Sequence, residues 1–487
     1  MKTIRCIMAQ CATIVAPCMV LAANFPESTG DIASNGADGW NGAMPSSTQV
    51  ASFVKNSGIY TASADVAFGS VNINGLYGIN FNLHESGNHT ITLGAFAISA
   101  DNRSATLNGG VWDFSGTATG SSNIDIGRLG PCNKYATART TLVLANGCLA
   151  TNVTSLIVSN GGGTNTFRIT DSSRVYTTSA LLFSNAGAVD GLLEVSSGGV
   201  LTLISGNLLD TNDSGAEVGN NRIVVTGSGS KISCPAAISG NNKVGFAVGY
   251  RGGHNSLLVE KGGEVIAPYQ FHVGRRDVSH TNSVTFRTGA KFTLGATNVG
   301  EYNSCGNTLE FLSEAYGTVS GTVRVGGYTY PSSGNKMIVS NATLSANSIV
   351  SGYSEAADVS AMFDNGLVVQ GDSSQMTLSN RLRIWNRSFL KFEPPKLGYS
   401  KTPITAADFY IDTSSAIEVV WPRSGVKPGV YTLVSTTGGI FRESSAIMDA
   451  ANASLAVQSG GIARLVLANG NKDLVLKVSR GVVISFR

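Results

Sequence analysis

An asparagine recurs at one position of a repeating unit of 25–34 residues, and this repeat restricts the chain to a stacked architecture. In each unit it stands four residues before the second of two apolar residues that alternate with polar ones, which is a strand pattern. One unit, between the first two, has Gly191 at that position. The asparagines are Asn165, Asn221, Asn255, Asn282, Asn307, Asn335 and Asn365. Self-similarity at such a period is typical of solenoid proteins.

The repeating unit is clearest in residues 282–300. Two runs of alternating apolar and polar residues are separated by a turn at 288–290, and a third apolar piece ends at Val299-Gly300. Three such short strands cannot bury their apolar face alone. We therefore predict an all-β fold, a right-handed parallel β-helix with one unit per coil and coils ~4.8 Å apart. Asparagines stacked in this way would hydrogen-bond along a column. A second landmark, the valine of a Val-Gly pair, recurs at Val248, Val273, Val299 and Val325.

The composition agrees with an all-β chain that turns often. Charged residues make up 13% and there are 58 glycines, while apolar residues still reach 42%, too many for a disordered chain. The formal net charge of +3 and the absence of a Lys/Arg run give no indication of a nucleic-acid partner.

Residues 1–23 have the pattern of a secretory signal peptide: Lys2 and Arg5 precede a mostly apolar stretch that ends in small residues. We expect cleavage near Ala23 and no transmembrane segment in the mature chain. A retained membrane anchor and a lipid attached to Cys18 are the alternatives, although Pro17 suits a lipid-attachment site poorly and the stretch is short for a spanning helix.

The rest of the chain divides into three parts. Residues 24–140 are expected to form an N-terminal cap and irregular first coils, since the ends of a solenoid differ from its middle. Residues 141–393 form the regular coils, and Pro394-Pro395 ends them. Residues 394–487 are expected to be a small β module that contains a hairpin around Asn469-Gly470.

No catalytic or metal-binding motif is present in the sequence. There is no Cys-x-x-Cys, His-Glu-x-x-His, nucleophile elbow, phosphate loop or calcium loop, so we expect neither a metal nor a cofactor. Cys132, Cys148, Cys234 and Cys305 lie in the mature chain, and their three disulfide pairings stay open.

The corners that follow the Val-Gly pairs are long, polar and variable, which favours them as a binding face. Two sets of candidate residues lie there. One is a polar cluster that comprises Arg251, His254, His272, Arg275, Arg276, Asp277, His280 and Glu301. We interpret it either as a site for anionic sugars or as a solvated corner in which His272 packs beside Val273. The other is a stripe of tyrosines, suited to sugar or protein contacts or merely covering the corner; it comprises Tyr250, Tyr302, Tyr328 and Tyr353.

The Gly- and Asn-rich units, with the pattern Asn-x-apolar-x-apolar-x-x-Gly-Ala-x-apolar, resemble autotransporter passenger regions and adhesin-like β-helices of Gram-negative bacteria. The segment 428–433 near the end is similar to the C-terminal part of such proteins. The resemblance covers residues 140–487 and is one of repeat style. It departs from complete autotransporters because residues 394–487 are too few for a translocator barrel, which leaves the export route open.

The resemblance implies an exported structural or adhesin-like protein, secreted or at the cell surface of a Gram-negative-type bacterium. Its most specific activity would be non-catalytic glycan binding, with polysaccharide or cell-surface components as partners. The alternative is a polysaccharide lyase or glycoside hydrolase that acts on acidic polysaccharide through the Arg275–Glu301 corner. A third possibility is that the chain only forms multimers through its ends.

Overall fold

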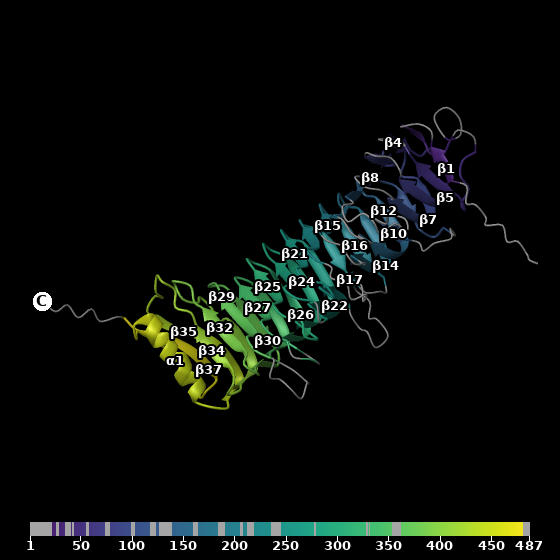
Figure 1. Ribbon diagram of the computed structural model, residues 1–487. Coiled ribbons are helices and arrows are strands. Elements are labelled where there is room, and N and C mark those ends of the chain that lie inside the picture. The colour runs from purple at the N-terminus through teal and green to yellow at the C-terminus, as the bar shows by residue number, and fades with distance from the viewer. Residues whose placement is uncertain are drawn as a thin grey trace, which may run out of the picture.

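The chain forms one elongated column of stacked coils. The computed structural model is a right-handed β-solenoid of about 12 turns, closed at the C-terminal end by a helix and an antiparallel hairpin (Figure 1). This confirms the predicted fold class. The structure describes residues 22–25, 29–34, 40, 43–54, 58–73, 78–98, 103–116, 123–125, 139–158, 164–183, 190–204, 208–211, 219–234, 245–276, 279–327, 330, 332–352 and 362–480.

Strands of successive coils pair into two sheets in the described part of the chain. The smaller, sheet B, has 15 strands: β2 (Thr29–Asp31), β4 (Gly58–Thr61), β6 (Ile79–Asn82), β8 (Arg103–Asn108), β11 (Thr140–Ala145), β13 (Thr166–Ile169), β15 (Leu192–Ser196), β18 (Arg222–Thr226), β21 (Ser256–Glu260), β23 (Ser283–Phe286), β25 (Thr308–Leu312), β27 (Lys336–Ser340), β29 (Gly366–Gln370), β32 (Phe389–Glu393) and β34 (Ala416–Val419). The larger, sheet A, has 22: β1 (Ala22–Phe25), β3 (Val50–Phe53), β5 (Val66–Ile73), β7 (Thr90–Ile98), β9 (Val111–Asp113), β10 (Asn123–Asp125), β12 (Leu149–Ile157), β14 (Arg174–Phe183), β16 (Val200–Leu203), β17 (Leu208–Thr211), β19 (Lys231–Ser233), β20 (Phe246–Val248), β22 (Glu264–Val273), β24 (Lys291–Val299), β26 (Tyr316–Val325), β28 (Thr343–Ser351), β30 (Gln375–Leu378), β31 (Arg381–Ile384), β33 (Ile404–Ile411), β35 (Gly429–Arg442), β36 (Ala463–Ala468) and β37 (Asp473–Val478).

A regular coil contributes one short strand to sheet B and one long, bent strand to sheet A. In the unit of residues 282–300 these are β23 and β24. The pairing of β22 with β24 shifts register between Ala267 and Gln270, which marks a bulge that bends the strand. The second and third short strands predicted for the unit of residues 282–300 are one continuous strand, β24, whereas β16 and β17 remain separate in an earlier coil.

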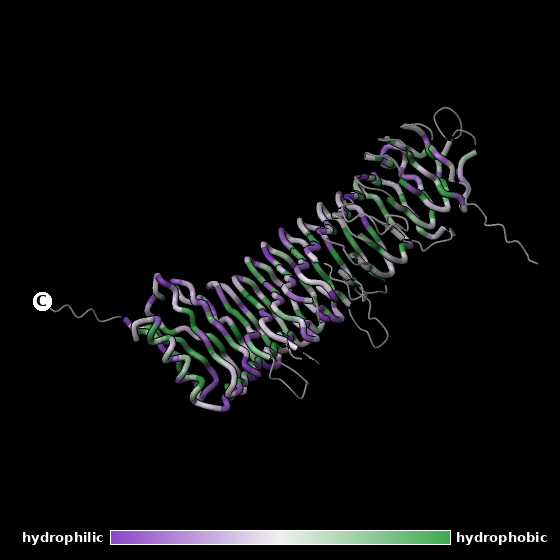
Figure 2. Tube along the Cα trace, in the orientation of Figure 1, coloured by the Kyte–Doolittle hydropathy of each residue, from purple (hydrophilic) through white to green (hydrophobic). Residues whose placement is uncertain are grey.

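The core fills the inside of the column, in many strands with alternate residues. In β23 the side chains of Val284 and Phe286 are buried and their neighbours are half-buried. Phe286 stacks on Phe311 of the next coil, with ring centroids 5.4 Å apart and planes 10° apart. Figure 2 shows the same alternation of hydrophobic and hydrophilic residues along successive coils. Each coil thus buries its apolar face only because its neighbours cover it.

The N-terminal coils belong to the same stack. β1 pairs in parallel with β3, and β3 pairs with β5. Trp40, an isolated large residue in the sequence, is buried, donates its indole N–H to the Ile32 carbonyl at 2.9 Å and packs edge-on against Phe25 at 4.8 Å. The expected irregular first coils are therefore in register with the rest and have an aromatic interior.

The parallel stack extends beyond Pro394. β33 and β34 each pair in parallel with a strand of the preceding coil, and β35 pairs in parallel with β33. The module that differs begins within β35, whose first half pairs antiparallel with β37, and the predicted hairpin of β36 and β37 is confirmed. Helix α1 (Ala446–Ser459), between β35 and β36, was not predicted; it covers the end of the stack (Figure 1).

Candidate functional site

The seven asparagines of the repeat form a buried column at the corner that precedes seven strands of sheet B, namely β13, β18, β21, β23, β25, β27 and β29. All seven are at most 1% exposed. The Asn307 carboxamide oxygen accepts hydrogen bonds from the backbone N–H and the side-chain Nδ2 of Asn282, both at 3.0 Å. Asn335 receives the same two bonds from Asn307, at 3.0 and 2.9 Å. The column therefore replaces, between coils, the backbone bonds that the corner leaves unmade.

Gly191 takes the place of the asparagine in one coil, where it can donate to the column through its N–H but has no carboxamide that could accept from it. Its N–H donates to the Asn221 carboxamide oxygen at 2.8 Å, and Asn165 continues the column on the other side by accepting from the Thr140 N–H at 3.2 Å. A Cβ on residue 191 would lie 2.5 Å from the Phe183 ring. An asparagine is excluded there because Phe183 fills its space.

Three charged or titratable side chains of the predicted polar cluster, those of His272, Arg275 and Glu301, lie close together at the corner that follows the Val-Gly pairs. Glu301 Oε2 lies 3.0 Å from His272 Nδ1 and 3.5 Å from Arg275 Nε. All three residues are buried, and His272 is only 1% exposed. The second ring nitrogen of His272, Nε2, is 3.3 Å from Gln270 Oε1. The interpretation as a solvated corner is wrong for these residues, because all three side chains are buried.

The electrostatics of this buried cluster favour an ionised carboxylate. Burial alone would raise the pKa of Glu301, but the His272 hydrogen bond and the positive charges of His272, Arg275 and Arg276 outweigh it, so the pKa lies below its ordinary value. A carboxylate with a lowered pKa and two cationic neighbours is a poor general base at neutral pH. The cluster is suited to holding the corner in place.

The outer side of the same corner is a file of aromatic and arginine side chains, here called the aromatic edge: Tyr250, Arg276, Tyr302 and Tyr330. The Arg276 guanidinium lies 5.6 Å from the centroid of the Tyr250 ring and 5.2 Å from that of Tyr302. Its Nη2 donates to the Tyr250 hydroxyl at 3.3 Å. Tyr302 and Tyr330 follow with ring centroids 5.4 Å apart. Cation–π contacts therefore join successive coils along the edge.

Exposure increases along the aromatic edge toward the C-terminus. Tyr250 is only 4% exposed, Arg276 and Tyr302 are half-buried, and Tyr330 is 49% exposed. The described residues therefore do not form a stripe of equally exposed tyrosines, because Arg276 covers Tyr250. Tyr330, which the sequence analysis did not single out, lies two residues after Tyr328 in the sequence, and its ring is tilted by 41° against that of Tyr302.

The remaining predicted residues are placed as follows. Arg251 is half-buried in the turn after Tyr250. His254 and His280 stay apart from His272: the Thr281 hydroxyl is 2.8 Å from His254 Nδ1, and His280 Nδ1 accepts from the Cys305 N–H at 3.2 Å. Asp277, Tyr328 and Tyr353 lie outside the described residues.

The three described cysteines, Cys148, Cys234 and Cys305, carry free thiols. Burial raises the pKa of the Cys234 thiol to about 12 and raises that of Cys148 as well. Cys132 is outside the described residues. Within the described ranges, no group of three or more His, Cys, Asp or Glu side chains could hold a metal ion.

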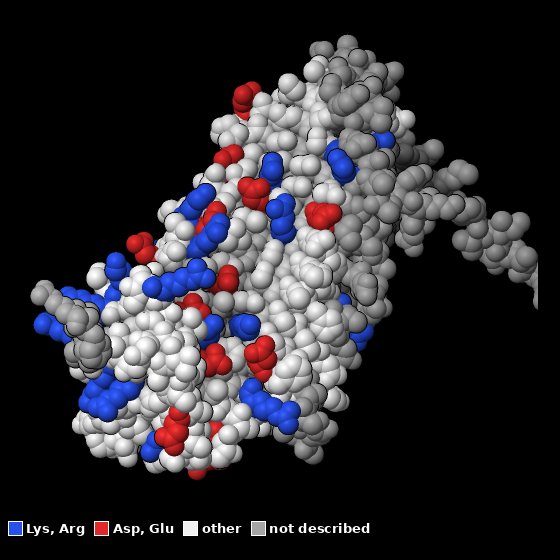
Figure 3. Space-filling view, turned by 60° about the vertical axis from the view of Figure 1, so that its left-hand side comes forward, with Lys and Arg blue, Asp and Glu red and all other residues white. Residues whose placement is uncertain are grey.

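Charges on the surface are mixed in sign. On the face shown in Figure 3, Lys and Arg alternate with Asp and Glu along the column. Two ion pairs join neighbouring coils, Arg287 with Glu260 at 2.8 Å and Arg168 with Glu194 at 3.0 Å. No helix among the residues that the structure describes has the length and apolar character needed to cross a membrane.

The fold and the asparagine column define the chain as a right-handed β-solenoid repeat protein. No family model, curated protein or solved structure matches it.

Proposed function

We propose that the chain is an exported structural or adhesin-like protein that binds a polysaccharide, or another cell-surface component, without catalysis. The observation that carries this proposal is the contact of Tyr302 with Tyr330 on the aromatic edge, with ring centroids 5.4 Å apart and ring planes tilted by 41°. Tyrosine combines an apolar ring face with a polar hydroxyl, and this combination suits the faces and hydroxyls of sugar rings. Neighbouring rings on successive coils would contact successive sugars of one chain.

The buried cluster supports such a binding edge by fixing it. Arg275 and Glu301 pair inside the corner, and each is followed directly in the sequence by an edge residue, Arg276 and Tyr302. Arg275 also lies 5.2 Å from the Tyr250 ring centroid. A binding surface whose side chains are held before the ligand arrives loses less conformational entropy on binding.

The proposed location is outside the cell or on its surface in a Gram-negative-type bacterium. The basic and then apolar residues of 1–23 support export. The Asn- and Gly-rich coils support a role like that of autotransporter passengers and adhesins, which present a long rigid column away from the cell.

One observation favours an enzyme as the second candidate. His272, Arg275 and Glu301 converge, as the residues of a polysaccharide lyase or glycoside hydrolase acting on acidic polysaccharide would. Their burial opposes this role, because a sugar could reach Glu301 only if the corner opened. The binding role requires no such opening.

The test is a glycan-array screen of the full mature chain, together with an activity assay on acidic polysaccharides. We expect array binding that falls at least tenfold in Tyr302→Ala and Tyr330→Ala. Tyr316→Ala is the matched control, because this tyrosine is as exposed as Tyr330 but lies on sheet A, beside Lys291. Equal binding by all three variants would remove the aromatic edge as the site, and cleavage that Glu301→Gln abolishes would establish the enzyme instead.

A further inference from the structure

A second group of aromatic side chains lies on the outer face of the C-terminal coils. Arg383 of β31, Tyr410 of β33 and Phe441 of β35 are register partners in successive coils of sheet A. The residue that precedes each of them in its strand is buried, so these three side chains point outward. Trp385 follows β31, and its ring lies edge-on to that of Tyr410, with centroids 5.9 Å apart and planes 87° apart. We call Trp385, Tyr410 and Phe441 the aromatic panel.

Trp385 stands where the preceding coils have a glycine. Ile384, just before it, is the register partner of Ser351, which is the partner of Val325. The glycines at the equivalent position of those coils are Gly249, Gly274, Gly300, Gly326 and Gly352. The last asparagine of the column, Asn365, lies against Gly326, so the coil of Trp385 has no carboxamide of the column to accommodate. The coil therefore permits a tryptophan here without needing one, which favours a role at the surface.

The aromatic panel is open to solvent and its orientation is fixed from below. Phe441 is 56% exposed, while Trp385 and Tyr410 are half-buried. The Arg383 guanidinium lies 4.8 Å from the centroid of the Trp385 ring, a cation–π contact that holds the indole in place. The panel thus offers aromatic surface without requiring the strands to move.

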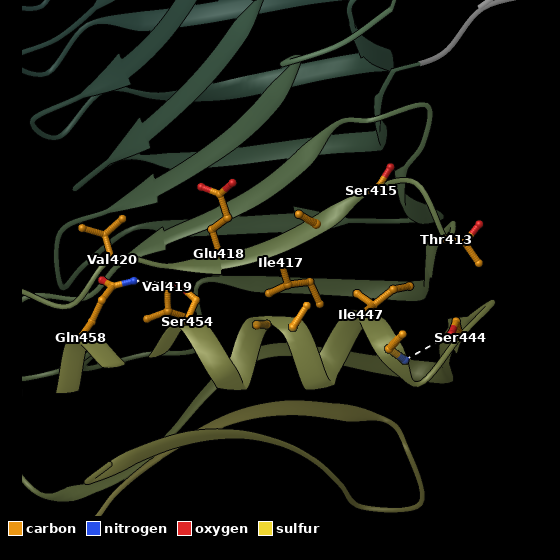
Figure 4. Close-up of a pocket in the computed structure, with 14 residues that line it drawn as sticks. Thr413, Ser415, Ile417, Glu418, Val419, Val420, Ser444, Ile447, Ser454 and Gln458 are labelled. Carbon is orange, nitrogen blue, oxygen red and sulfur yellow. Dashed lines mark hydrogen bonds between the residues drawn. The ribbon is translucent and has the colours of Figure 1, made fainter. Parts of the chain in front are cut away.

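Glu443 is held at one side of the aromatic panel by the start of helix α1. Its carboxylate accepts from the Tyr410 hydroxyl and from the Thr413 N–H, the latter at 3.1 Å. The next residue, Ser444, accepts the Ala446 N–H at 3.1 Å. Figure 4 shows Thr413 and Ser444 at the same end of the helix, with the Ser444 bond as a dashed line. Groups oriented in this way lose little conformational entropy when a ligand binds.

Charges of both signs flank the aromatic panel. Arg381 and Asp408 are register partners on one side of the row of Tyr410 and Phe441, and Glu443 lies on the other. A charged ligand would meet a like charge here, whereas the hydroxyl groups of a neutral sugar can donate to the carboxylates and accept from the guanidinium groups.

The size of the aromatic panel also favours a sugar chain over a protein. Its rings occupy three successive coils, a length of about 10 Å. A stable protein interface needs about 800 Å² on each partner, which is more than three partly buried rings provide. A short stretch of saccharide needs only a few ring contacts with hydrogen-bonding groups beside them.

We propose that the aromatic panel is a second saccharide site, which binds a neutral sugar chain along the row of Tyr410 and Phe441. The apolar face of a sugar ring packs on Phe441, and Asp408 and Glu443 accept hydrogen bonds from its hydroxyl groups. The coil of Trp385 is the second after the coil of Tyr330, so this site uses none of the residues of the aromatic edge. It stands whether or not the aromatic edge binds a glycan.

The fluorescence of Trp385 in the full mature chain tests the proposal. Trp40 and Trp112 are buried, so Trp421→Phe leaves Trp385 as the only tryptophan that is not fully buried. Titration with short neutral oligosaccharides of glucose, mannose and galactose should give a saturable fluorescence change with at least one of them.

Phe441→Ala in the same background should weaken this binding at least tenfold. Phe363→Ala is the matched control and should leave the affinity unchanged, because Phe363 is 51% exposed but lies outside the aromatic panel, in the corner before Asn365. Equal losses in the two variants would overturn the proposal.

The absence of a response to every neutral oligosaccharide would also overturn the proposal, as would a response to oligouronides alone, because the ligand would then be charged. Tyr302→Ala should leave the Trp385 response unchanged. Failure of this site is therefore distinguishable from failure of the proposed function, which is read at the aromatic edge.

Discussion

Gly274 packs directly against the carboxamide of Asn307: a Cβ on residue 274 would lie 2.4 Å from Asn307 Cγ. The glycines of the other Val-Gly pairs approach, in the same way, the second asparagine of the column that follows them, at 2.2–2.3 Å; the pairs are Gly249 with Asn282, Gly300 with Asn335 and Gly326 with Asn365. The asparagine and the Val-Gly pair, which recur separately in the sequence, therefore pack against each other in the structure. The glycine makes room for the asparagine that joins the coils.

Gly274→Ala should lower the free energy of unfolding by roughly 1–3 kcal/mol more than Gly289→Ala. Both residues have nearly the same positive φ, +71° and +73°, so the backbone cost of an alanine is shared. Only residue 274 would press its Cβ into Asn307, since nothing lies within 4 Å of a Cβ at 289. Urea denaturation of the two variants measures the difference, and equal losses would show that packing against Asn307 is unimportant.

Asn307→Ala should destabilise the chain by about 1–3 kcal/mol, because it leaves the buried Asn282 N–H without its acceptor. Asn347→Ala provides the comparison: this asparagine is exposed on β28 and its carboxamide oxygen contacts the neighbouring Ser348 hydroxyl. Its loss should change stability by less than 0.5 kcal/mol or so. Similar thermal shifts in the two variants would contradict a column that holds the coils together.

Acid should weaken the corner that carries the aromatic edge. The pKa of Glu301 is lower in the folded chain than its ordinary value, so its contribution is complete above the unfolded-state pKa of about 4.3 and is lost as pH falls through the lower folded value. The difference in unfolding free energy between wild type and Glu301→Gln should therefore be constant near neutral pH and shrink below about pH 4. A difference that stayed unchanged down to pH 2 would argue against the paired carboxylate.

The buried thiols should resist alkylation while the chain is folded. Burial raises the pKa of Cys234 to about 12, which keeps it protonated, and Cys148 is buried as well. In a Cys132→Ser background, iodoacetamide at pH 8 should modify half-buried Cys305 first, and the other two only after denaturant is added. Rapid modification of Cys234 in the native chain would disprove its burial.

The repeat made the fold predictable because each coil solves the same packing problem. The asparagine represented by Asn282 and the Val-Gly pair represented by Val299-Gly300 recur because successive coils need the same hydrogen bond at the corner and the same close approach of a glycine to an asparagine side chain. The C-terminal end has no such repetition. Helix α1 was missed although Ile447, Ala451 and Leu455 have helical spacing, because the flanking strands suggested a uniform β module. The extension of parallel pairing past Pro394 was missed because a single coil without its asparagine has no detectable period.

The candidate site was predictable in its location and only partly in its composition. Spacing placed Arg275 and Glu301 one coil apart, which brought them together. It could not show that they turn inward while Arg276 and Tyr302 turn outward, because corners lack the alternation that fixes direction in a strand. The choice of Tyr330 depends on the path of its own long corner, which the sequence does not specify.

The central claim is that equivalent residues of successive coils lie one strand spacing apart. Arg168, Thr285 and Lys391 occupy one register row of sheet B, four coils separating each from the next. Pulsed electron-spin distances between labelled cysteines, with Cys132 and Cys305 replaced by serine, should be about 19 Å for 168–285 and about 38 Å for 168–391. Distances that do not double from the first pair to the second would contradict the column.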